Sequence, residues 1–141
     1  MKGALPFLDT NGLIYAFAED DPRTKAAEIL LAGGGVVGVQ TLNEFVAVAT
    51  RKLAMPWEEV LEALSAIRVL CPSPVPLTVE THDAALRIAG RYGYGFYDSL
   101  VIAAALEAGC GTLFSEDMHD GQVIEGLTIR NPFLDGESTS P

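Results

Sequence analysis

Short, apolar, strand-like segments alternate along the chain with longer segments of helical periodicity. Strands joined through helices by right-handed crossovers run parallel, and the helices then cover both faces of the sheet. No internal repeat or linker interrupts the pattern. The sequence therefore predicts an α/β fold, a three-layer α/β/α sandwich around a mainly parallel central sheet. The expected strands are residues 4–8, 36–39, 69–71, 112–114 and 127–129.

Capping residues and glycines indicate where the helices begin and end. Asp21-Pro22 pairs an N-cap residue with proline at the first helical position, and Thr78 can also cap a helix. Thr41-Leu-Asn-Glu44 has the spacing of a capping box. Glycines at 33–35 and at 93 are expected to stop helices. The expected helices span residues 11–18, 22–32, 41–53, 56–67, 78–89 and 97–106.

The length of 141 residues and an apolar content of 49% suit one domain with its own core. We expect residues 1–133 to form this domain and residues 134–141 to form a flexible tail. No apolar run approaches the ~18 residues of a membrane span, and the first eight residues lack a signal-peptide pattern. Two cysteines and two histidines show neither disulfide-scaffold nor zinc spacing. The expected class is a cytoplasmic enzyme or binding module that makes no membrane contact.

Four acidic residues fall where the expected elements place the carboxyl ends of strands. Asp9 and Asp117 follow strands directly, whereas Glu44 and Asp98 occupy the first turns of helices. Ligand sites of open parallel sheets lie beyond these ends, so the four carboxylates are expected to share a pocket. Clustered carboxylates cost stability unless a cation compensates, and oxygen-only ligands favour Mg²⁺ or Mn²⁺. The pattern predicts a metal site suited to phosphoryl chemistry.

Each acid taken alone has a plain structural explanation. Glu44 is the third helical residue of the predicted capping box, Asp98 can complement a helix N-terminus, and Asp117 can begin a turn. Asp9, at the end of an apolar strand and beside Thr10, fits such explanations less well. The conjunction of the four acids favours a functional site.

The net charge of −10 argues against nucleic-acid binding through a broad basic surface. Two bound divalent ions would offset four of those ten charges and leave the mouth of the site locally attractive to phosphate. Among the aromatic residues at 92, 94, 96 and 97, most are expected in the core or a lid, though one could stack a base. The side chains that could add phosphate contacts are Arg51, Lys52, Arg87 and Arg91.

Two other functions compete with metal-dependent phosphodiester cleavage. The acidic face could be a non-catalytic surface for a basic peptide. Alternatively, Asp9 could be the nucleophile of a phosphatase. The second residue after Asp9 is Asn11 rather than an acid, which weakens the phosphatase hypothesis.

The stretches around the four acids resemble the PIN-domain family, in particular its VapC-like ribonuclease toxins of toxin–antitoxin pairs. The resemblance covers about Phe7 to Phe133, with the motifs in the family's order. The matching stretches are Phe7-Leu-Asp-Thr-Asn-Gly-Leu-Ile-Tyr15, Thr41-Leu-Asn-Glu-Phe45, Tyr97-Asp-Ser-Leu-Val-Ile-Ala-Ala-Ala105 and Leu113-Phe-Ser-Glu-Asp-Met-His-Asp-Gly121.

The resemblance implies a metal-dependent endoribonuclease whose acidic residues bind Mg²⁺ or Mn²⁺. It also implies the PIN sandwich, a homodimer, an RNA substrate and a small antitoxin partner whose tail blocks the acidic groove. Asp9 and Asp98 would be the main direct metal ligands, and Glu116 and Asp120 would tune the site from its rim. The implied catalytic and metal-binding residues are Asp9, Glu44, Asp98 and Asp117, with Asn11 and Ser115 as supporting residues.

Overall fold

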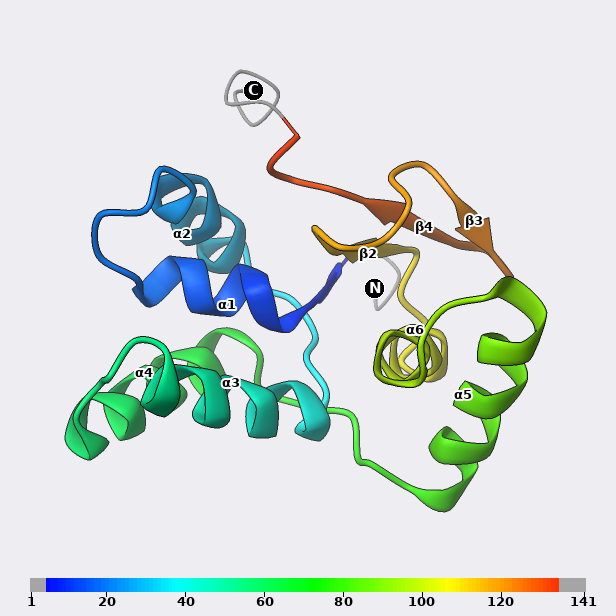
Figure 1. Cartoon of the computed structure of the whole chain (residues 1–141), viewed down its shortest axis with the longest axis horizontal. Helices are drawn as coiled ribbons and strands as arrows, with labels where there is room; N and C mark the ends of the chain where they lie inside the picture. Colours follow the sequence, from blue (N-terminus) through cyan, green and yellow to red (C-terminus); the bar gives the residue numbers. More distant parts are fainter. Residues whose placement is uncertain (1–4, 135–141) are drawn as a thin grey trace.

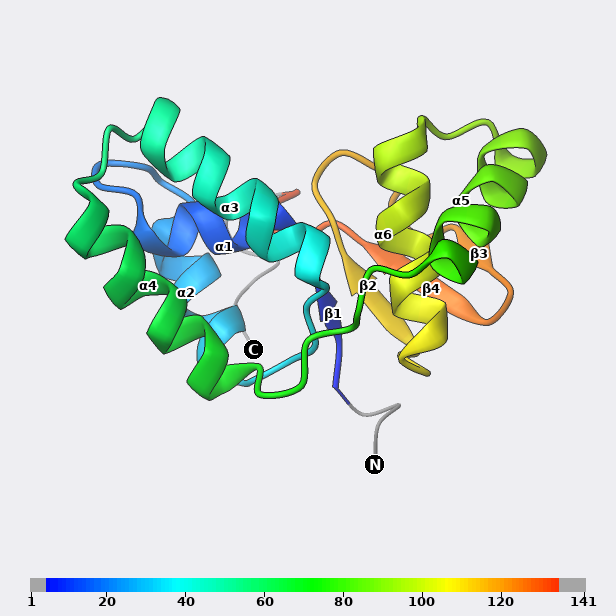
Figure 2. The ribbon, with the colours of Figure 1, turned by 90° about the horizontal axis from the view of Figure 1, so that it is seen from below.

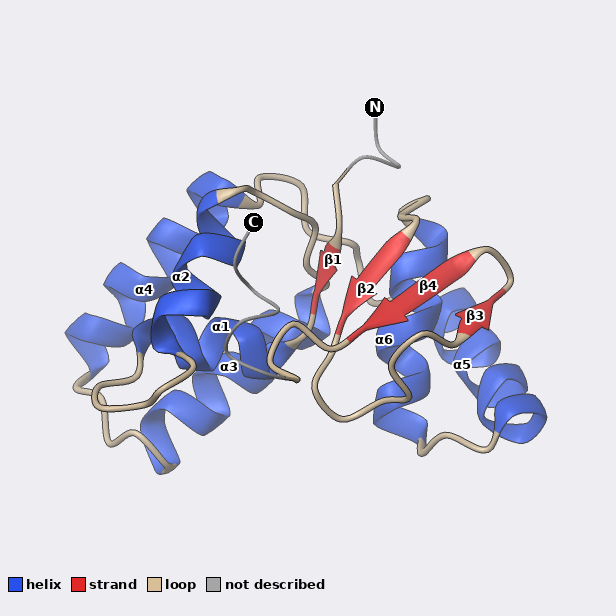
Figure 3. Ribbon diagram, turned by 90° about the horizontal axis from the view of Figure 1, so that it is seen from above, coloured by secondary structure: helices blue, strands red, loops and turns tan. Residues whose placement is uncertain are grey.

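Four short strands form a mixed, mostly parallel sheet in the middle of the molecule (Figure 3). The structure is a computed structural model, and it describes residues 5–134. The strands are β1 (Phe7–Leu8), β2 (Thr112–Phe114), β3 (Val123–Ile124) and β4 (Leu127–Arg130). Their order is β1-β2-β4-β3. β1 pairs in parallel with β2, β2 pairs in parallel with β4, and β3 is antiparallel to β4.

Helices cover both faces of this sheet. Figure 1 shows α1 to α4 gathered on one side of the strands and α5 with α6 on the other, and Figure 2 shows the same division from below. The predicted three-layer sandwich with a mainly parallel sheet is therefore confirmed. The helices are α1 (Thr10–Phe17), α2 (Thr24–Ala32), α3 (Val39–Arg51), α4 (Trp57–Leu70), α5 (Val79–Tyr92) and α6 (Phe96–Glu107).

The sheet separates two hydrophobic cores. Successive side chains of a strand point to opposite faces, and the two residues of β1 follow this rule. Phe7 packs with α5, α6 and the other strands, whereas Leu8 packs with α1 to α4. Both side chains are almost fully buried, at 0% and 2% exposure. The strand has only two residues, but packing on both faces holds it in place. It therefore also sets the position of Asp9, the residue that follows it.

The strand expected at 36–39 is present only as isolated bridges. Val36 pairs with Phe7 and Gly38 pairs with Val75, both in parallel, and no regular strand forms there. Gly38 is already the extended N-cap of α3, so the chain becomes helical at Val39. A Cβ at Gly35 would lie 2.9 Å from the carbonyl oxygen of Pro6, so glycine is what allows this segment to approach β1.

The predicted capping box at Thr41–Glu44 is wrong. α3 begins at Val39, after Gly38, so Thr41 lies inside the helix and is 2% exposed. The Glu44 carboxylate accepts a hydrogen bond from Thr10 instead. The alternative structural role proposed for Glu44 therefore does not exist in this fold.

Three other local predictions are corrected by the structure. The strand expected at 69–71 is the last turn of α4, where Val69 is 77% exposed; the helix ends shortly before a proline. Asp21 is not a helix N-cap, because its carboxylate closes a turn onto the N–H of Arg23 and α2 begins at Thr24. The two-residue strand β3 was not expected from the sequence.

Other boundaries agree with the sequence. The Thr78 side chain accepts a hydrogen bond from the N–H of Thr81 at the start of α5, and Gly93 ends that helix in the left-handed conformation. The tail expected at 134–141 lies, except for Leu134, outside the described residues, and the domain limit at 133 stays a prediction. Within residues 5–134, no helix is long and apolar enough to cross a membrane.

Candidate active site

Asp9 lies where β1 ends and α1 begins. One of its carboxylate oxygens accepts the N–H of Thr10 at 2.7 Å and so caps α1; the other accepts the hydroxyl of Ser115 at 3.0 Å. The side chain is only 8% exposed. Burial raises the pKa of Asp9 to about 6 against the two hydrogen bonds, and the negative charges of Asp98 and Glu44 add to the rise.

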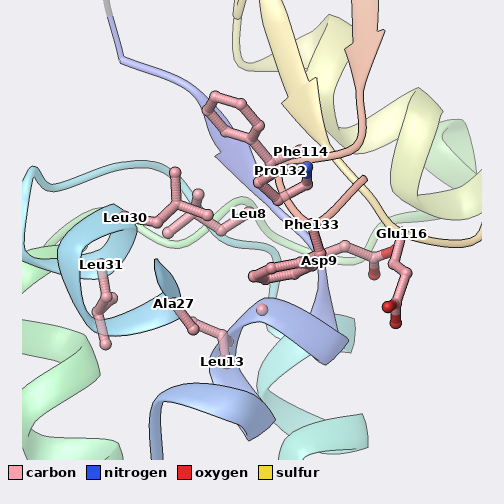
Figure 4. Close-up of a pocket in the computed structure, with 11 residues that line it drawn as sticks. Leu8, Asp9, Leu13, Ala27, Leu30, Leu31, Phe114, Glu116, Pro132 and Phe133 are labelled. Carbon is pink, nitrogen blue, oxygen red and sulfur yellow. The ribbon is translucent and has the colours of Figure 1, made fainter. Parts of the chain in front are cut away.

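Asp9 also lines a second, small pocket, together with Glu116 and several apolar side chains (Figure 4). This pocket has a volume of about 10 Å³, which is room for at most about one water molecule. Leu13 of α1, Phe114 of β2 and Phe133 from the C-terminal segment contribute to its wall.

α3 and α6 contribute the second and third acids. Glu44 accepts a 2.8 Å hydrogen bond from the hydroxyl of Thr10, the residue that follows Asp9. The first and second acids are therefore linked through the start of α1. Asp98 lies in the first turn of α6, as predicted. Burial, followed by the charges of Asp117 and Glu44, raises the pKa of Asp98.

The fourth acid lies in the loop after β2. The Asp117 carboxylate accepts a hydrogen bond from the side-chain amide of Asn11 at 2.8 Å. Asn11 and Ser115, both expected to support the site, therefore each contact one of the four acids.

The four acids line one open cleft of about 300 Å³. They come from four separate parts of the chain: the β1–α1 junction, α3, α6 and the loop after β2. Arg51 is the one cationic side chain among the described residues that line the cleft. The remaining lining residues are Thr10, Asn11, Ala47, Val48, Tyr97 and Val101.

The donor set fits a hard divalent cation. All four candidate ligands are carboxylates, and burial and mutual repulsion raise the pKa values of Asp9 and Asp98. Among residues 5–134, no three acid, histidine or cysteine side chains converge as a preformed metal cage. Mg²⁺ is commonly held by only one or two carboxylates and keeps several waters, so an open carboxylate cleft is compatible with it.

The PIN domain family profile matches residues 7–119, which include all four acids and most of the 141-residue chain. The chain belongs to the PIN-domain family. No curated protein sequence matches it significantly.

Two solved structures share the fold of this PIN domain. VapC20 of Mycobacterium tuberculosis, a sarcin–ricin loop cleaving toxin, aligns with a TM-score of 0.62 and 19% identity over 79% of this chain and 90% of its own. VapBC2 of Rickettsia felis, bound to a DNA fragment from its promoter, aligns with a TM-score of 0.62 and 18% identity over 90% and 98%. The PIN domain thus has the fold of VapC toxins.

The loop that carries Asp117 is held by an arrangement that we call the Arg23 clamp, made of Tyr15, Asp21, Arg23 and Glu116. The guanidinium of Arg23 lies 3.8 Å from the centre of the Tyr15 ring and forms ion pairs with Asp21 at 3.0 Å and Glu116 at 2.9 Å. The Tyr15 hydroxyl donates to the other oxygen of Glu116 at 2.6 Å.

The clamp gives two adjacent acids of the PIN domain different roles. The Glu116 carboxylate is occupied by Tyr15 and Arg23, whereas Asp117 faces the cleft. Asp120, the other acid expected at the rim, accepts the N–H of Asn131 at 2.8 Å. Sequence reasoning missed the clamp, and no local signal could have revealed it, because Arg23 and Glu116 are 93 positions apart.

The raised pKa of Asp9 predicts how stability depends on pH in metal-free protein. The Asp9 carboxyl titrates near 3.8 in an ordinary environment and near 6 in the fold, so the folded state binds more protons between these pH values. The free energy of unfolding should therefore fall as pH rises through this window, by up to about 3 kcal/mol from this residue.

Urea denaturation in EDTA from pH 4 to pH 7 measures this contribution. The parent should lose stability relative to Asp9→Asn as pH rises, because asparagine does not titrate. A constant difference between the two proteins across the window would contradict the raised pKa.

Proposed function

We propose that this PIN domain is a metal-dependent endoribonuclease that acts as the toxin of a toxin–antitoxin pair. The observation that carries the proposal is the convergence of Asp9, Glu44, Asp98 and Asp117 on one cleft. In this shared space the charges of Asp98 and Glu44 help to raise the pKa of Asp9, and the charges of Asp117 and Glu44 help to raise the pKa of Asp98.

The acids would hold Mg²⁺ or Mn²⁺ and would not attack the substrate covalently. Asp9 and Asp98 are proposed as the main ligands, with Glu44 and Asp117 completing the charge of the site. When bound, the ion supplies an acidified water and polarises the scissile phosphodiester. Thr10, Asn11 and Ser115 fix the orientation of the carboxylates through their hydrogen bonds.

The two structural relatives support the biological part of the proposal. VapC20 is a toxin that cleaves the sarcin–ricin loop, which supports RNA as the substrate class. VapBC2 bound to promoter DNA supports an antitoxin protein as the partner. A homodimer, and one nuclease domain extending over residues 1–133, belong to the same proposal.

The phosphatase alternative is disfavoured by the surroundings of Asp9. Two residues later, where the haloacid dehalogenase-like phosphatase motif needs an acid, Asn11 instead binds Asp117. An acidic surface that binds a basic peptide without catalysis is the alternative that experiment must separate.

Metal-dependent RNA cleavage tests the proposed function directly. A panel of structured and single-stranded RNAs should be cut by the parent with Mg²⁺ or Mn²⁺ and left intact in EDTA. Asp98→Asn should remove the cleavage. Asp83→Asn, at an exposed position on α5, is the matched control and should cleave at the parent's rate.

Thermal denaturation provides a readout that does not depend on having found a good substrate. An ion that binds only the folded state at 100 times its Kd adds about 2.7 kcal/mol. The parent and Asp83→Asn should melt higher with Mn²⁺, and Asp98→Asn should respond much less. No cleavage and no metal effect in the parent would favour the peptide-binding surface.

A further inference from the structure

Tyr97 is unusually exposed for an aromatic residue of this protein. Among residues 5–134, only Trp57 and Tyr97 are exposed members of the Phe, Tyr and Trp set, at 59% and 62%. Tyr97 lines the acidic cleft, whereas Trp57 begins α4 and does not. The one solvent-facing aromatic ring of the cleft therefore stands directly beside Asp98.

The Tyr97 ring is packed on one side although its side chain is exposed. It lies in the first turn of α6, and Phe96 packs against its ring with a centroid distance of 5.6 Å and an interplanar angle of 72°. Phe96 in turn packs against His82 of α5 at 5.3 Å. A ring braced in this way loses little conformational freedom when a flat ligand covers it.

Arg51 lies on the α3 wall of the cleft. It is in the last turn of α3, seven residues after Glu44, or about 10 Å along the helix. In the described part of the chain, ion pairs form between Arg23 and its two acids, and Arg51 has no carboxylate partner. The cleft thus holds an exposed, unpaired guanidinium at a distance from its acids.

Apolar side chains lie between these polar features. Ala47 and Val48 follow Glu44 by three and four residues on the same face of α3, and Val101 follows Asp98 by three on α6. Asp9 is buried, whereas Arg51 and Tyr97 are exposed. The cleft therefore combines one buried acid, Asp9, with apolar walls and with an exposed cation and an exposed ring.

We propose that Tyr97 and Arg51 form a subsite for one unpaired nucleotide next to the scissile phosphate of the RNA. The base stacks on Tyr97 and a neighbouring phosphate pairs with Arg51. This inference rests on the proposed function and assigns two substrate-positioning residues to it. A base inside a duplex has both faces covered by its neighbours, so stacking on Tyr97 requires an unpaired base.

The subsite also explains how a chain with a net charge of −10 can bind RNA. Binding would depend on one stacked base and one phosphate contact in addition to the metal site, without a broad basic surface. Base–aromatic stacking contributes about 1–3 kcal/mol, which corresponds to roughly 5- to 150-fold in affinity. The Arg51 contact should contribute about 0.7 to the slope of log K against log salt.

The test measures binding of a fluorescent single strand of about ten nucleotides and of its duplex by anisotropy. All proteins carry Asp9→Asn, so that the RNA survives the measurement. Tyr97→Ala should weaken single-strand binding by roughly 5- to 150-fold, and Tyr97→Phe should stay within about twofold. Trp57→Ala, which removes the other exposed ring, is the matched control and should bind normally. Arg51→Ala should reduce the salt slope by about 0.7, and Arg51→Lys should preserve it.

Two outcomes would overturn the subsite. One is unchanged single-strand binding by Tyr97→Ala. The other is an equal loss in Tyr97→Phe, which keeps the ring. Metal-dependent cleavage by the parent together with either outcome would leave the proposed nuclease standing and remove the subsite. If single-strand binding depends on the Tyr97 ring but the parent cleaves no RNA, the subsite stands and the proposed nuclease activity falls.

Discussion

Asp9→Asn should abolish metal-dependent RNA cleavage and leave the fold intact. The substitution removes the negative charge that is buried deepest in the cleft, where a divalent ion contributes several kcal/mol of charge stabilisation. We expect the cleavage rate to fall by at least about a thousandfold. The measurement is the initial rate of cleavage of a labelled RNA in Mg²⁺, with Asp83→Asn as the control that keeps the parent's rate.

The hydrogen bonds around Asp9 explain why the variant should fold. The asparagine oxygen can still accept the N–H of Thr10 and cap α1. The Ser115 hydroxyl, which donates to Asp9 in the parent, can rotate and accept from the new amide. In EDTA above pH 6 the variant should be at least as stable as the parent, because it no longer buries a charge. Cleavage at the parent's rate, with contaminating nuclease excluded, would remove Asp9 from the mechanism.

Phe45→Ala should cause the largest loss of stability among the substitutions considered. Phe45 follows Glu44 in α3, is fully buried, and packs edge-on against Phe17 of α1 at 5.8 Å. Removing a buried ring costs about 3–5 kcal/mol, a large share of the 5–15 kcal/mol that roughly stabilise a domain. Urea denaturation should show a lower midpoint at pH 7 with an unchanged slope.

Val69→Ala is the matched control for this loss. Val69 is 77% exposed in the last turn of α4, so its free energy of unfolding should change by less than about 0.5 kcal/mol. A comparable loss in both variants would mean that Val69 is buried, as expected for the strand predicted at 69–71, and not exposed on α4. A loss below about 1 kcal/mol in Phe45→Ala would mean that α3 is not anchored by its buried face.

The parts of the fold that the sequence predicted are those with strong local signals. Thr78 caps α5 and Gly93 ends it because their preferred conformations match those positions. The continuous apolarity of α6 corresponds to a helix whose residues 99–105 are all buried. Asp9 follows β1 as expected, because an apolar strand gave way to turn-forming residues.

The predicted helix and strand boundaries were wrong where two local sequence signals competed or where no local signal existed. Thr41 has the side chain of a capping residue, but Gly38 is the extended N-cap and α3 begins at the next residue, Val39. Val69 is β-branched, yet the helix that begins after Pro56 continues through it because Val60, Ala63 and Ile67 bury one face. In both cases tertiary packing decided between alternatives that are close in local free energy.

The candidate site was predictable in outline because topology concentrates it. In a parallel sheet, the loops after the strands gather at one edge, so acids far apart in sequence could be expected to share a cleft. The contacts that hold them there were not predictable. Thr10 binds Glu44 and Arg23 binds Glu116 across 34 and 93 residues. At such separations the sequence does not indicate which side chains will meet.

The position of β2 also has a consequence for the growing chain. β1, which delivers Asp9, pairs with β2 through Phe7–Leu113 and Leu8–Phe114, and its other neighbour contributes a single bridge at Val36. A nascent chain that ends before Thr112 has three of the four acids, but it lacks the central strand of the sheet and the loop with Asp117. Contacts of such long sequence separation form late. Synthesis must therefore pass Asp117 before the cleft can close, and a chain that stops before this residue carries no finished site.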